Sequence, residues 1–234
     1  MTRDWDSPGG AVVVPWVLLI LAVVSVVMMI LFSLLSSEGQ AVWIQFWGFE
    51  PARVMERLAM PPSTWLSEDL SGLLTALVVH AGWLHLLGNL AYLWVFGIPV
   101  ERVVGHWGIL LVFVLLGGFA NLCVAWQLAD MTTPVIGASG GVSAVIGVYL
   151  GLFPARNMGL WLPLGLYLQF ARIPGILVIG SWFILQLLYT VFGPVTGAVA
   201  WWTHVVGFLA GLVIALFLRL FSSGIQRRIM EFRN

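Results

Sequence analysis

Long uncharged stretches of apolar residues constrain this chain more than any other feature of its sequence. Residues 11–36 and residues 173–218 contain no charged side chain. A helix needs about 20 apolar residues to cross a bilayer, so the first stretch can hold one span and the second can hold two. Charged residues make up 9% of the chain, against roughly 25% in soluble domains. The sequence therefore predicts a membrane protein.

Six membrane-spanning helices are predicted from these stretches and from the residues that interrupt them. Gly193 and Pro194 divide the longest stretch, because glycine and proline favour a turn between helices. Charged residues end the spans in the middle of the chain. The predicted spans are residues 11–36, 83–100, 107–129, 136–155, 173–191 and 199–218.

The expected fold class is all-α, a polytopic membrane protein built as a bundle of six transmembrane helices. Its length favours one domain over residues 1–234, with a core at about 70–220 and short tails at 1–10 and 221–234. All ten basic residues are arginine. With the N-terminus inside, only Arg53 and Arg57 lie outside, so the positive-inside rule predicts two cytoplasmic ends. Arginine-only basic usage and short tails favour a bacterial inner membrane.

Two connections between spans have a distinctive composition. Residues 40–70 form the one long outer connection and mix aromatic with charged residues, which suits either the bilayer interface or an ordinary folded loop. Residues 157–170 are apolar but contain glycine and proline, and we expect an interfacial connection on the inner side.

Four polar residues lie within the predicted spans, where such groups are costly and often functional. His85 and Asn89 belong to span two, Ser139 to span four and His204 to span six. Even-numbered spans all run from outside to inside, and each of these residues lies near the start of its span. The sequence therefore predicts that hydroxyl, imidazole and carboxamide groups meet at one shallow depth below the outer face.

Ser139 is flanked by glycines at the start of span four. Glycine lets a reacting carbonyl approach the backbone, and the unpaired N–H groups of a helix N-terminus can stabilise an oxyanion. Taken alone, such a run is more often a packing feature. Small residues recur at every fourth position from Ser139 to Gly151 and from Thr203 to Ala215. These two stripes predict close packing of spans four and six, which would bring Ser139 within reach of His204.

His85 and Asn89 are four residues apart and share a helix face. Both can donate hydrogen bonds to an oxyanion, although a hydrogen bond between helices would explain the pair equally well. His80 precedes the span and is expected to be structural. His106 lies on the cytoplasmic side and receives no role.

The groups required by other hydrolytic mechanisms are missing from the sequence. No acidic residue lies in a span to orient His204, so we expect a dyad rather than a Ser-His-Asp triad. The histidines lack a neighbouring carboxylate or thiolate, so neither a metal site nor a cofactor is expected. A net charge of zero gives no electrostatic argument for nucleic acid. The single cysteine, Cys123, is expected to be an inert packing residue.

Taken together and in order, these motifs resemble the rhomboid family of intramembrane serine proteases. A further family feature, Glu101-x-x-x-Gly105, follows span two. The main matching pieces are His80-x-x-x-x-His85-x-x-x-Asn89, Gly137-Ala138-Ser139-Gly140 and His204-x-x-Gly207-x-x-x-Gly211.

The resemblance implies a serine endopeptidase that needs no cofactor. Ser139 would attack the peptide bond and His204 would accept its proton, while His85, Asn89 and the Ser139 backbone N–H would bind the oxyanion. The substrates would be transmembrane proteins cut in or beside a membrane span. The outer connection at 40–70 would be the family's interfacial loop, and span five its substrate gate. The structural neighbours of the site would be His80, Gly137, Gly140, Gly207 and Gly211.

Ser143 departs from the family pattern. Many members carry there an aromatic residue that packs on the catalytic histidine. In this chain the orientation of the His204 imidazole is therefore expected to depend on other neighbours.

Two other functions fit a six-span bundle. A catalytically silent rhomboid-like protein could bind membrane helices, but such relatives usually lack the serine or the histidine, and both are present here. A small transporter or channel would be expected to show internal repeats or charged groups along a path, and the sequence has neither. The oligomeric state is left open by the sequence.

Overall fold

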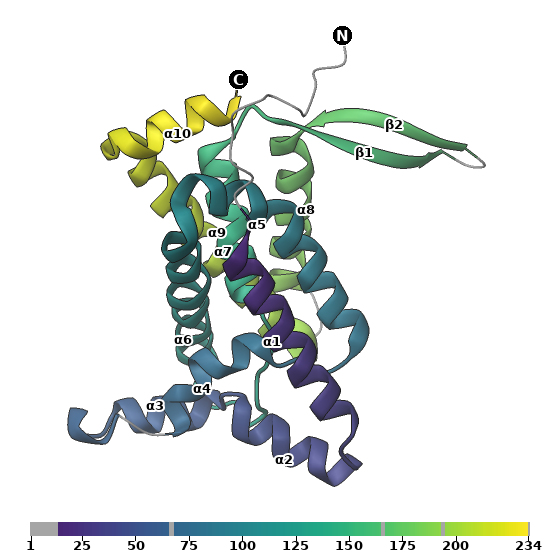
Figure 1. Cartoon of the computed structure of the whole chain (residues 1–234). Coiled ribbons are helices and arrows are strands. Elements are labelled where there is room, and N and C mark those ends of the chain that lie inside the picture. Colours follow the sequence, from purple (N-terminus) through teal and green to yellow (C-terminus); the bar gives the residue numbers. More distant parts are fainter. Residues whose placement is uncertain (1–13, 66–67, 165–166, 193–194, 234) are drawn as a thin grey trace.

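The computed structural model describes residues 14–65, 68–164, 167–192 and 195–233. A bundle of helices makes up most of it (Figure 1). The bundle contains α1 (Trp16–Ser33), α5 (Trp83–Leu111), α6 (Gly117–Gln127), α7 (Ser139–Leu152), α8 (Gly175–Phe192) and α9 (Val195–Phe221). Across one end lie α2 (Ser37–Trp47), α3 (Pro51–Leu58) and α4 (Glu68–Thr75). At the other end lie α10 (Ser223–Arg233) and the strands β1 (Asn157–Leu164) and β2 (Tyr167–Pro174).

Three stretches of the described chain are long and apolar enough to cross a bilayer: Trp16–Ser33, Trp83–Gln127 and Trp201–Phe221. This is a multi-pass membrane protein. The middle stretch covers 45 residues and combines predicted spans two and three. Its helix is interrupted at Gly105, where φ is 80°, a left-handed conformation that favours glycine. The helix α7 falls within predicted span four, and α8 overlaps predicted span five, but both are shorter than the predicted spans. The count of six spans therefore remains a prediction.

The predicted division of the longest apolar stretch is consistent with the helix boundaries. The helix α8 ends at Phe192 and α9 begins at Val195. The turn residues Gly193 and Pro194 themselves lie outside the described residues, as does the predicted N-terminal tail.

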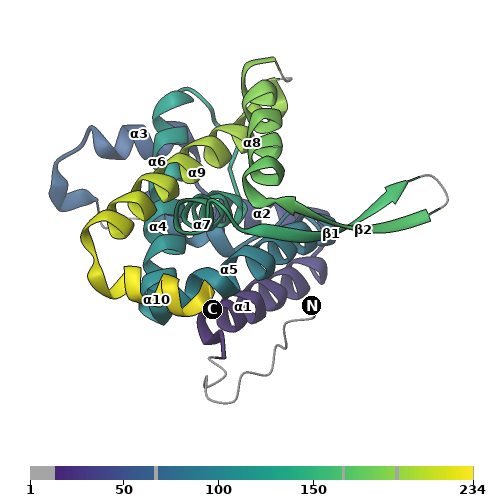
Figure 2. The same ribbon diagram turned by 90° about the horizontal axis from the view of Figure 1, so that it is seen from above.

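The helix α7 occupies the centre of the bundle when the protein is seen along its axis (Figure 2), and nearly all of its residues are buried. With 14 residues it is about 21 Å long, shorter than the hydrocarbon core of ~30 Å. Irregular backbone before a short helix is tolerated at membrane depth when protein surrounds it, because its polar groups find partners there. The central position of α7 therefore allows a loop to lead directly into Ser139.

The two small-residue stripes predicted from the sequence face each other in the contact between α7 and α9, the most extensive helix contact of the bundle. A β-carbon on Gly147 of the first stripe would overlap the Phe208 backbone, and one on Gly151 would overlap the Ala215 side chain. On the second stripe, β-carbons on Gly207 and Gly211 would overlap the α7 backbone. The helices approach this closely because neither stripe carries a large side chain. The predicted close packing is confirmed.

A buried carboxylate joins the start of α1 to α5. The Glu101 side chain is only 1% exposed and accepts hydrogen bonds from the backbone N–H groups of Val17 (3.1 Å) and Leu18 (3.4 Å). His106 Nδ1 lies 2.5 Å from the same carboxylate. The first N–H groups of a helix have no partner inside the helix, so Glu101 satisfies two of them and fixes the start of α1.

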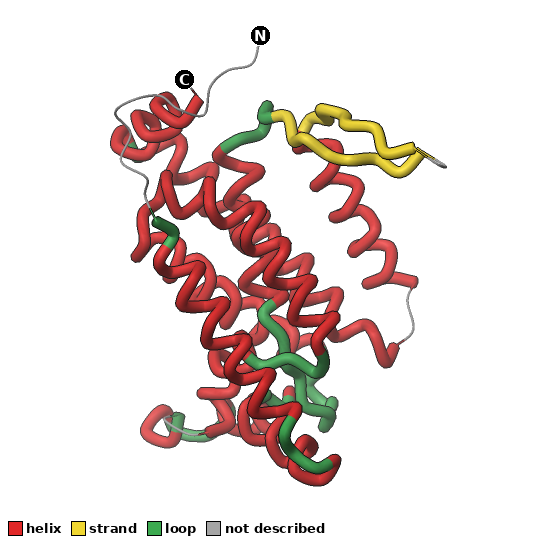
Figure 3. The backbone as a smooth tube through the Cα atoms, turned by 45° about the vertical axis from the view of Figure 1, so that its right-hand side comes forward, coloured by secondary structure: helices red, strands yellow, loops and turns green. Residues whose placement is uncertain are grey.

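The segment after α7 differs from the prediction. The strands β1 and β2 pair in an antiparallel arrangement that projects from the bundle (Figure 3), with Asn157 opposite Pro174 and Leu164 opposite Tyr167. The expectation of an all-α chain is wrong for this segment, whereas its expected interfacial location stays a prediction. Leucines alternate with other residues from Leu160 to Leu168, and this period of two is typical of a strand.

The outer connection folds into helices and is tied to the loop that precedes α7. The backbones of Phe49 and Val135 exchange two hydrogen bonds, of 3.1 and 2.8 Å. Thr75 Oγ1 donates to the Trp47 carbonyl at 2.8 Å, which joins α4 to the end of α2. Phe49 is 1% exposed. These contacts show that the segment is folded and packs against the loop before Ser139. Its location at the bilayer interface stays a prediction.

Candidate active site

The loop that leads into α7 presents Ser139 as the first residue of that helix. Gly137 has a φ of 136°, which L side chains rarely adopt, and its N–H donates to the Ala76 carbonyl at 2.9 Å. The side chain of Ala138, which precedes the helix, provides no cap. The N–H groups of the first turn have no partner inside the helix. Hydroxyl and amide groups therefore share the outer end of α7, as a nucleophile with an oxyanion site requires.

The absence of a side chain at Gly137 lets His85 and Ser139 lie close to one point. A β-carbon at Gly137 would lie 3.0 Å from His85 Cε1, 3.3 Å from His85 Nε2 and 3.7 Å from Ser139 Oγ, so it would crowd the imidazole. The imidazole and the hydroxyl thus border the same point, although they come from α5 and α7. The prediction that spans two and four converge is borne out at this position. Any larger residue at position 137 would crowd the two side chains.

Asn89 lies one turn after His85 on α5 and is 8% exposed. Its Nδ2 donates to the His85 carbonyl oxygen at 3.1 Å. This hydrogen bond uses one of the two N–H groups of the carboxamide and fixes its orientation. The second N–H can still serve an oxyanion. The hydrogen bond to another helix, which was the alternative from the sequence, is replaced by a bond within α5.

His204 reaches this region from α9. It precedes Gly207 by three residues and so shares the face that packs against α7, at the level of the loop before Ser139. The imidazoles of His85 and His204 are close enough to interact electrostatically.

Two tryptophans surround the His204 ring. The Trp201 ring is nearly perpendicular to it, with centroids 5.6 Å apart, and the Trp182 ring on α8 is 6.2 Å away. Ser143, in contrast, is 1% exposed and buried in α7. The sequence analysis did not identify these partners. Trp201 could have been found because it lies three residues before His204, whereas Trp182 comes from another helix.

His80 lies behind His85, with ring centroids 5.1 Å apart and the rings at 73°. It is 1% exposed. Burial, together with the charge of His85, lowers the pKa of His80 to about 4. His80 is therefore neutral at physiological pH, and its ring packs edge-on against the His85 ring. Its structural role stays a prediction.

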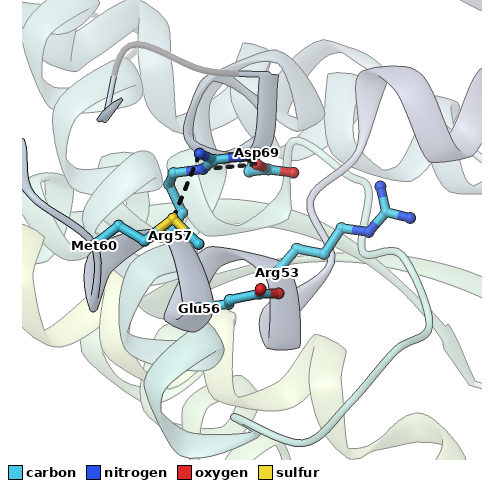
Figure 4. A pocket seen from close by; sticks show the side chains of 5 residues that line it. All are labelled: Arg53, Glu56, Arg57, Met60 and Asp69. Carbon is cyan, nitrogen blue, oxygen red and sulfur yellow. Dashed lines mark hydrogen bonds and ion pairs between the residues drawn. The ribbon is translucent and has the colours of Figure 1, made fainter. Parts of the chain in front are cut away.

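A polar cavity of about 240 Å³ lies elsewhere, beside α3 and α4 (Figure 4). Its arginines have acidic partners. Arg57 donates to Asp69 Oδ2 through Nε (3.0 Å) and through a terminal nitrogen (2.8 Å), and Arg53 pairs with Glu50 at 3.2 Å. The Arg57–Asp69 pair joins α3 to α4, whereas the Arg53–Glu50 pair is local to the start of α3. None of the predicted site residues lines the cavity.

The comparison with protein families gives one match. The Rhomboid domain family matches residues 67–221, which is more than half of the chain. The match begins in α4 and ends with α9, so it includes every residue of the site described above.

Individual relatives match shorter segments. Rhomboid-related protein 3 of Homo sapiens is 42% identical over 77 residues, 33% of this chain and 19% of that protein. Rhomboid-like protein 11, chloroplastic, of Arabidopsis thaliana is 38% identical over 74 residues, 32% of this chain and 26% of that protein. YdcA of Bacillus subtilis, whose name describes a candidate rhomboid protease, is 34% identical over 85 residues, 36% of this chain and 42% of that protein. The matched segments thus cover less than half of each relative.

Proposed function

Because this chain belongs to the rhomboid family, we propose that it is an intramembrane serine endopeptidase. Ser139 is the nucleophile and His204 is its general base. His85, Asn89 and the Ser139 backbone N–H bind the oxyanion. The observation that carries the proposal is the close approach at Gly137, where His85 Nε2 and Ser139 Oγ lie 3.3 and 3.7 Å from one point.

The reaction follows from these positions. His204 takes the proton of the Ser139 hydroxyl while Oγ bonds to the substrate carbonyl carbon, and the carbonyl oxygen becomes an oxyanion. The carbon–nitrogen bond then breaks, the amine leaves with the proton from His204, and an acyl-enzyme ester remains. A water molecule, deprotonated by His204, attacks the ester and releases the carboxylic acid and Ser139. Donors fixed around the oxyanion lower the barrier of both attacks.

Aromatic rings help to orient the general base. Trp201 and Trp182 contact the His204 ring from two helices, which restricts the rotation of the imidazole. The side chains of Ser139 and His204 are half-buried, so both keep some contact with the surroundings of the protein. This exposure supports access of the water that hydrolysis consumes.

The substrates that suit this site are membrane-anchored proteins cut in or beside a transmembrane segment, as the family resemblance implies. The site belongs to the outer end of the bundle, so the scissile bond would lie just below the outer surface of the membrane. The arginine distribution supports an orientation with both ends in the cytoplasm.

A serine-directed fluorophosphonate probe tests the proposal. We expect it to label the wild-type protein in detergent or bilayer, and to label neither Ser139→Ala nor His204→Ala. Ser143→Ala is the matched control, since it removes a hydroxyl from the same helix one turn further on and should keep labelling. Equal labelling of all four proteins would overturn the proposal.

A cleavage assay separates the protease from a catalytically silent relative that only binds membrane helices. Purified protein is incubated with a panel of single-span substrates. The protease should release fragments that are absent with Ser139→Ala. Binding of the same substrates by wild type and Ser139→Ala without any fragment would favour the silent relative.

A further inference from the structure

A cavity of about 310 Å³ opens at the end of the bundle that carries α10, the end predicted to face the cytoplasm. The inner ends of α7 and α9 and one residue of α10 line it. Among its described lining residues are Arg156 and Arg219 but no carboxylate. Apolar side chains, including Leu152, Phe153 and Ile229, form the rest of the wall.

Both arginines are held in place by other parts of the chain. A terminal nitrogen of Arg219 donates to the Gly151 carbonyl at 3.3 Å, at the end of α7. The guanidinium carbon of Arg156 lies 5.7 Å from the centroid of the Phe153 ring, within the range of a cation–π contact. A guanidinium has five N–H donors, so the single bond from Arg219 to a carbonyl leaves donors for a ligand.

The helix α10 is fixed to this wall. Gln226 Nε2 donates to the Arg219 carbonyl at 2.8 Å, and Ile229 is 8% exposed. Arg228 donates to the Val103 carbonyl at 3.0 Å and so ties α10 to α5. Hydrogen bonds to α9 and α5 therefore hold α10 in position, so the wall of the cavity that α10 contributes is ordered.

The described lining of this cavity differs in charge from that of the cavity beside α3, which includes Glu56 and Asp69 as well as two arginines. Two guanidinium groups in one lining suit an anionic ligand.

We propose that this cavity binds the headgroup of an anionic phospholipid, with the phosphate between Arg156 and Arg219. The planar guanidinium matches phosphate geometry and forms strong charge-assisted hydrogen bonds. Basic pockets between transmembrane helices on the cytoplasmic side bind anionic headgroups. The apolar wall suits the glycerol and the first methylenes of the lipid, which inorganic phosphate would not use. This site is independent of the proposed proteolysis.

Thermal unfolding of the full chain in detergent provides the first test. We expect added phosphatidylglycerol to raise the melting temperature, and phosphatidylcholine or inorganic phosphate at equal concentration to leave it unchanged. In the double variant Arg156→Gln/Arg219→Gln the shift is lost, because each charge-assisted bond is worth at least about tenfold in affinity. Arg227→Gln, which removes an exposed charge of α10 outside the cavity, keeps it. An equal shift with phosphatidylcholine, or in the double variant, overturns the proposal; an equal shift with phosphate assigns a simple anion site instead.

A measurement on the wild-type protein covers the case in which the double variant does not fold. A photoactivatable phosphatidylglycerol is incorporated into vesicles with the full chain, and the labelled peptides are mapped. We expect labelling around residues 152–156 and 225–230, which excess phosphatidylglycerol suppresses and phosphatidylcholine does not. Labelling spread evenly over the inner ends of all helices would refute a specific site.

Discussion

Gly207 on α9 packs against the backbone of Gly140 on α7, one residue after the proposed nucleophile. A β-carbon on Gly207 would overlap the Gly140 carbonyl group. His204 lies three residues earlier on the same helix, so the distance between α7 and α9 at this contact also determines how closely the imidazole can approach Ser139.

The first prediction concerns this contact. Gly207→Ala forces the helices apart and should destabilise the protein by roughly 1–3 kcal/mol, the usual cost of overpacking, with a loss of cleavage. Gly180→Ala on α8 is the matched control, because nothing lies within 4 Å of a β-carbon there. That change should be neutral or stabilising, since alanine favours a helix over glycine by about 1 kcal/mol. Thermal unfolding and substrate cleavage of both variants would check this. Equal melting temperatures and equal cleavage rates for Gly207→Ala and Gly180→Ala would contradict the prediction.

The second prediction concerns the aromatic rings around His204. Trp182→Leu removes the ring of α8 that contacts the imidazole, and kcat should fall about tenfold, as ring–ring contacts are worth roughly 0.5–1.5 kcal/mol. Trp182→Phe retains a ring and should recover most of the activity. Trp107→Leu, at a residue 77% exposed, should leave kcat unchanged. A fall in kcat of the same size for Phe and Leu at position 182 would argue against an orienting role.

The third prediction separates catalysis from stability at Asn89. Asn89→Ala removes a proposed oxyanion donor and should lower kcat by about 10²–10³-fold with little change in KM. Asn121 offers a matched control, since it is 2% exposed and donates to a backbone carbonyl, that of Leu73, at 2.7 Å. Asn121→Ala should lower the melting temperature comparably without a selective loss of kcat. If the two variants lose kcat equally, Asn89 is only structural.

The fourth prediction concerns pH. Burial lowers the pKa of His80 from 6.5 to about 4, so between these values the unfolded chain binds a proton that the folded chain does not. The stability contributed by neutral His80 is complete above about pH 6.5 and is lost as the pH falls toward 4, by up to ~3 kcal/mol. The melting temperature of His80→Phe should therefore fall less between pH 7 and pH 4.5 than that of the wild type. An unchanged slope in His80→Phe would rule out this cause.

Much of the site was predictable from local patterns. Uncharged stretches located the helices, because the bilayer excludes unpaired polar groups from its interior. The four-residue recurrence of small side chains predicted the contact between α7 and α9, and the position of each polar residue in its span predicted a shared depth. The strands β1 and β2 were missed, although the alternating leucines from Leu160 onward are a strand signal, because their apolar composition suited an interfacial segment equally well.

The amino-acid sequence by itself determined that the chain enters the membrane, which helices carry Ser139, His85, Asn89 and His204, and that α7 and α9 can approach closely. Only the tertiary structure decided which rings surround His204, that Asn89 bonds within its own helix, and that Arg156 and Arg219 line one cavity. The physical reason is that hydropathy and periodicity are properties of neighbouring residues. The partners of Trp182 and Arg219 lie on other helices, so these contacts depend on how the whole bundle packs.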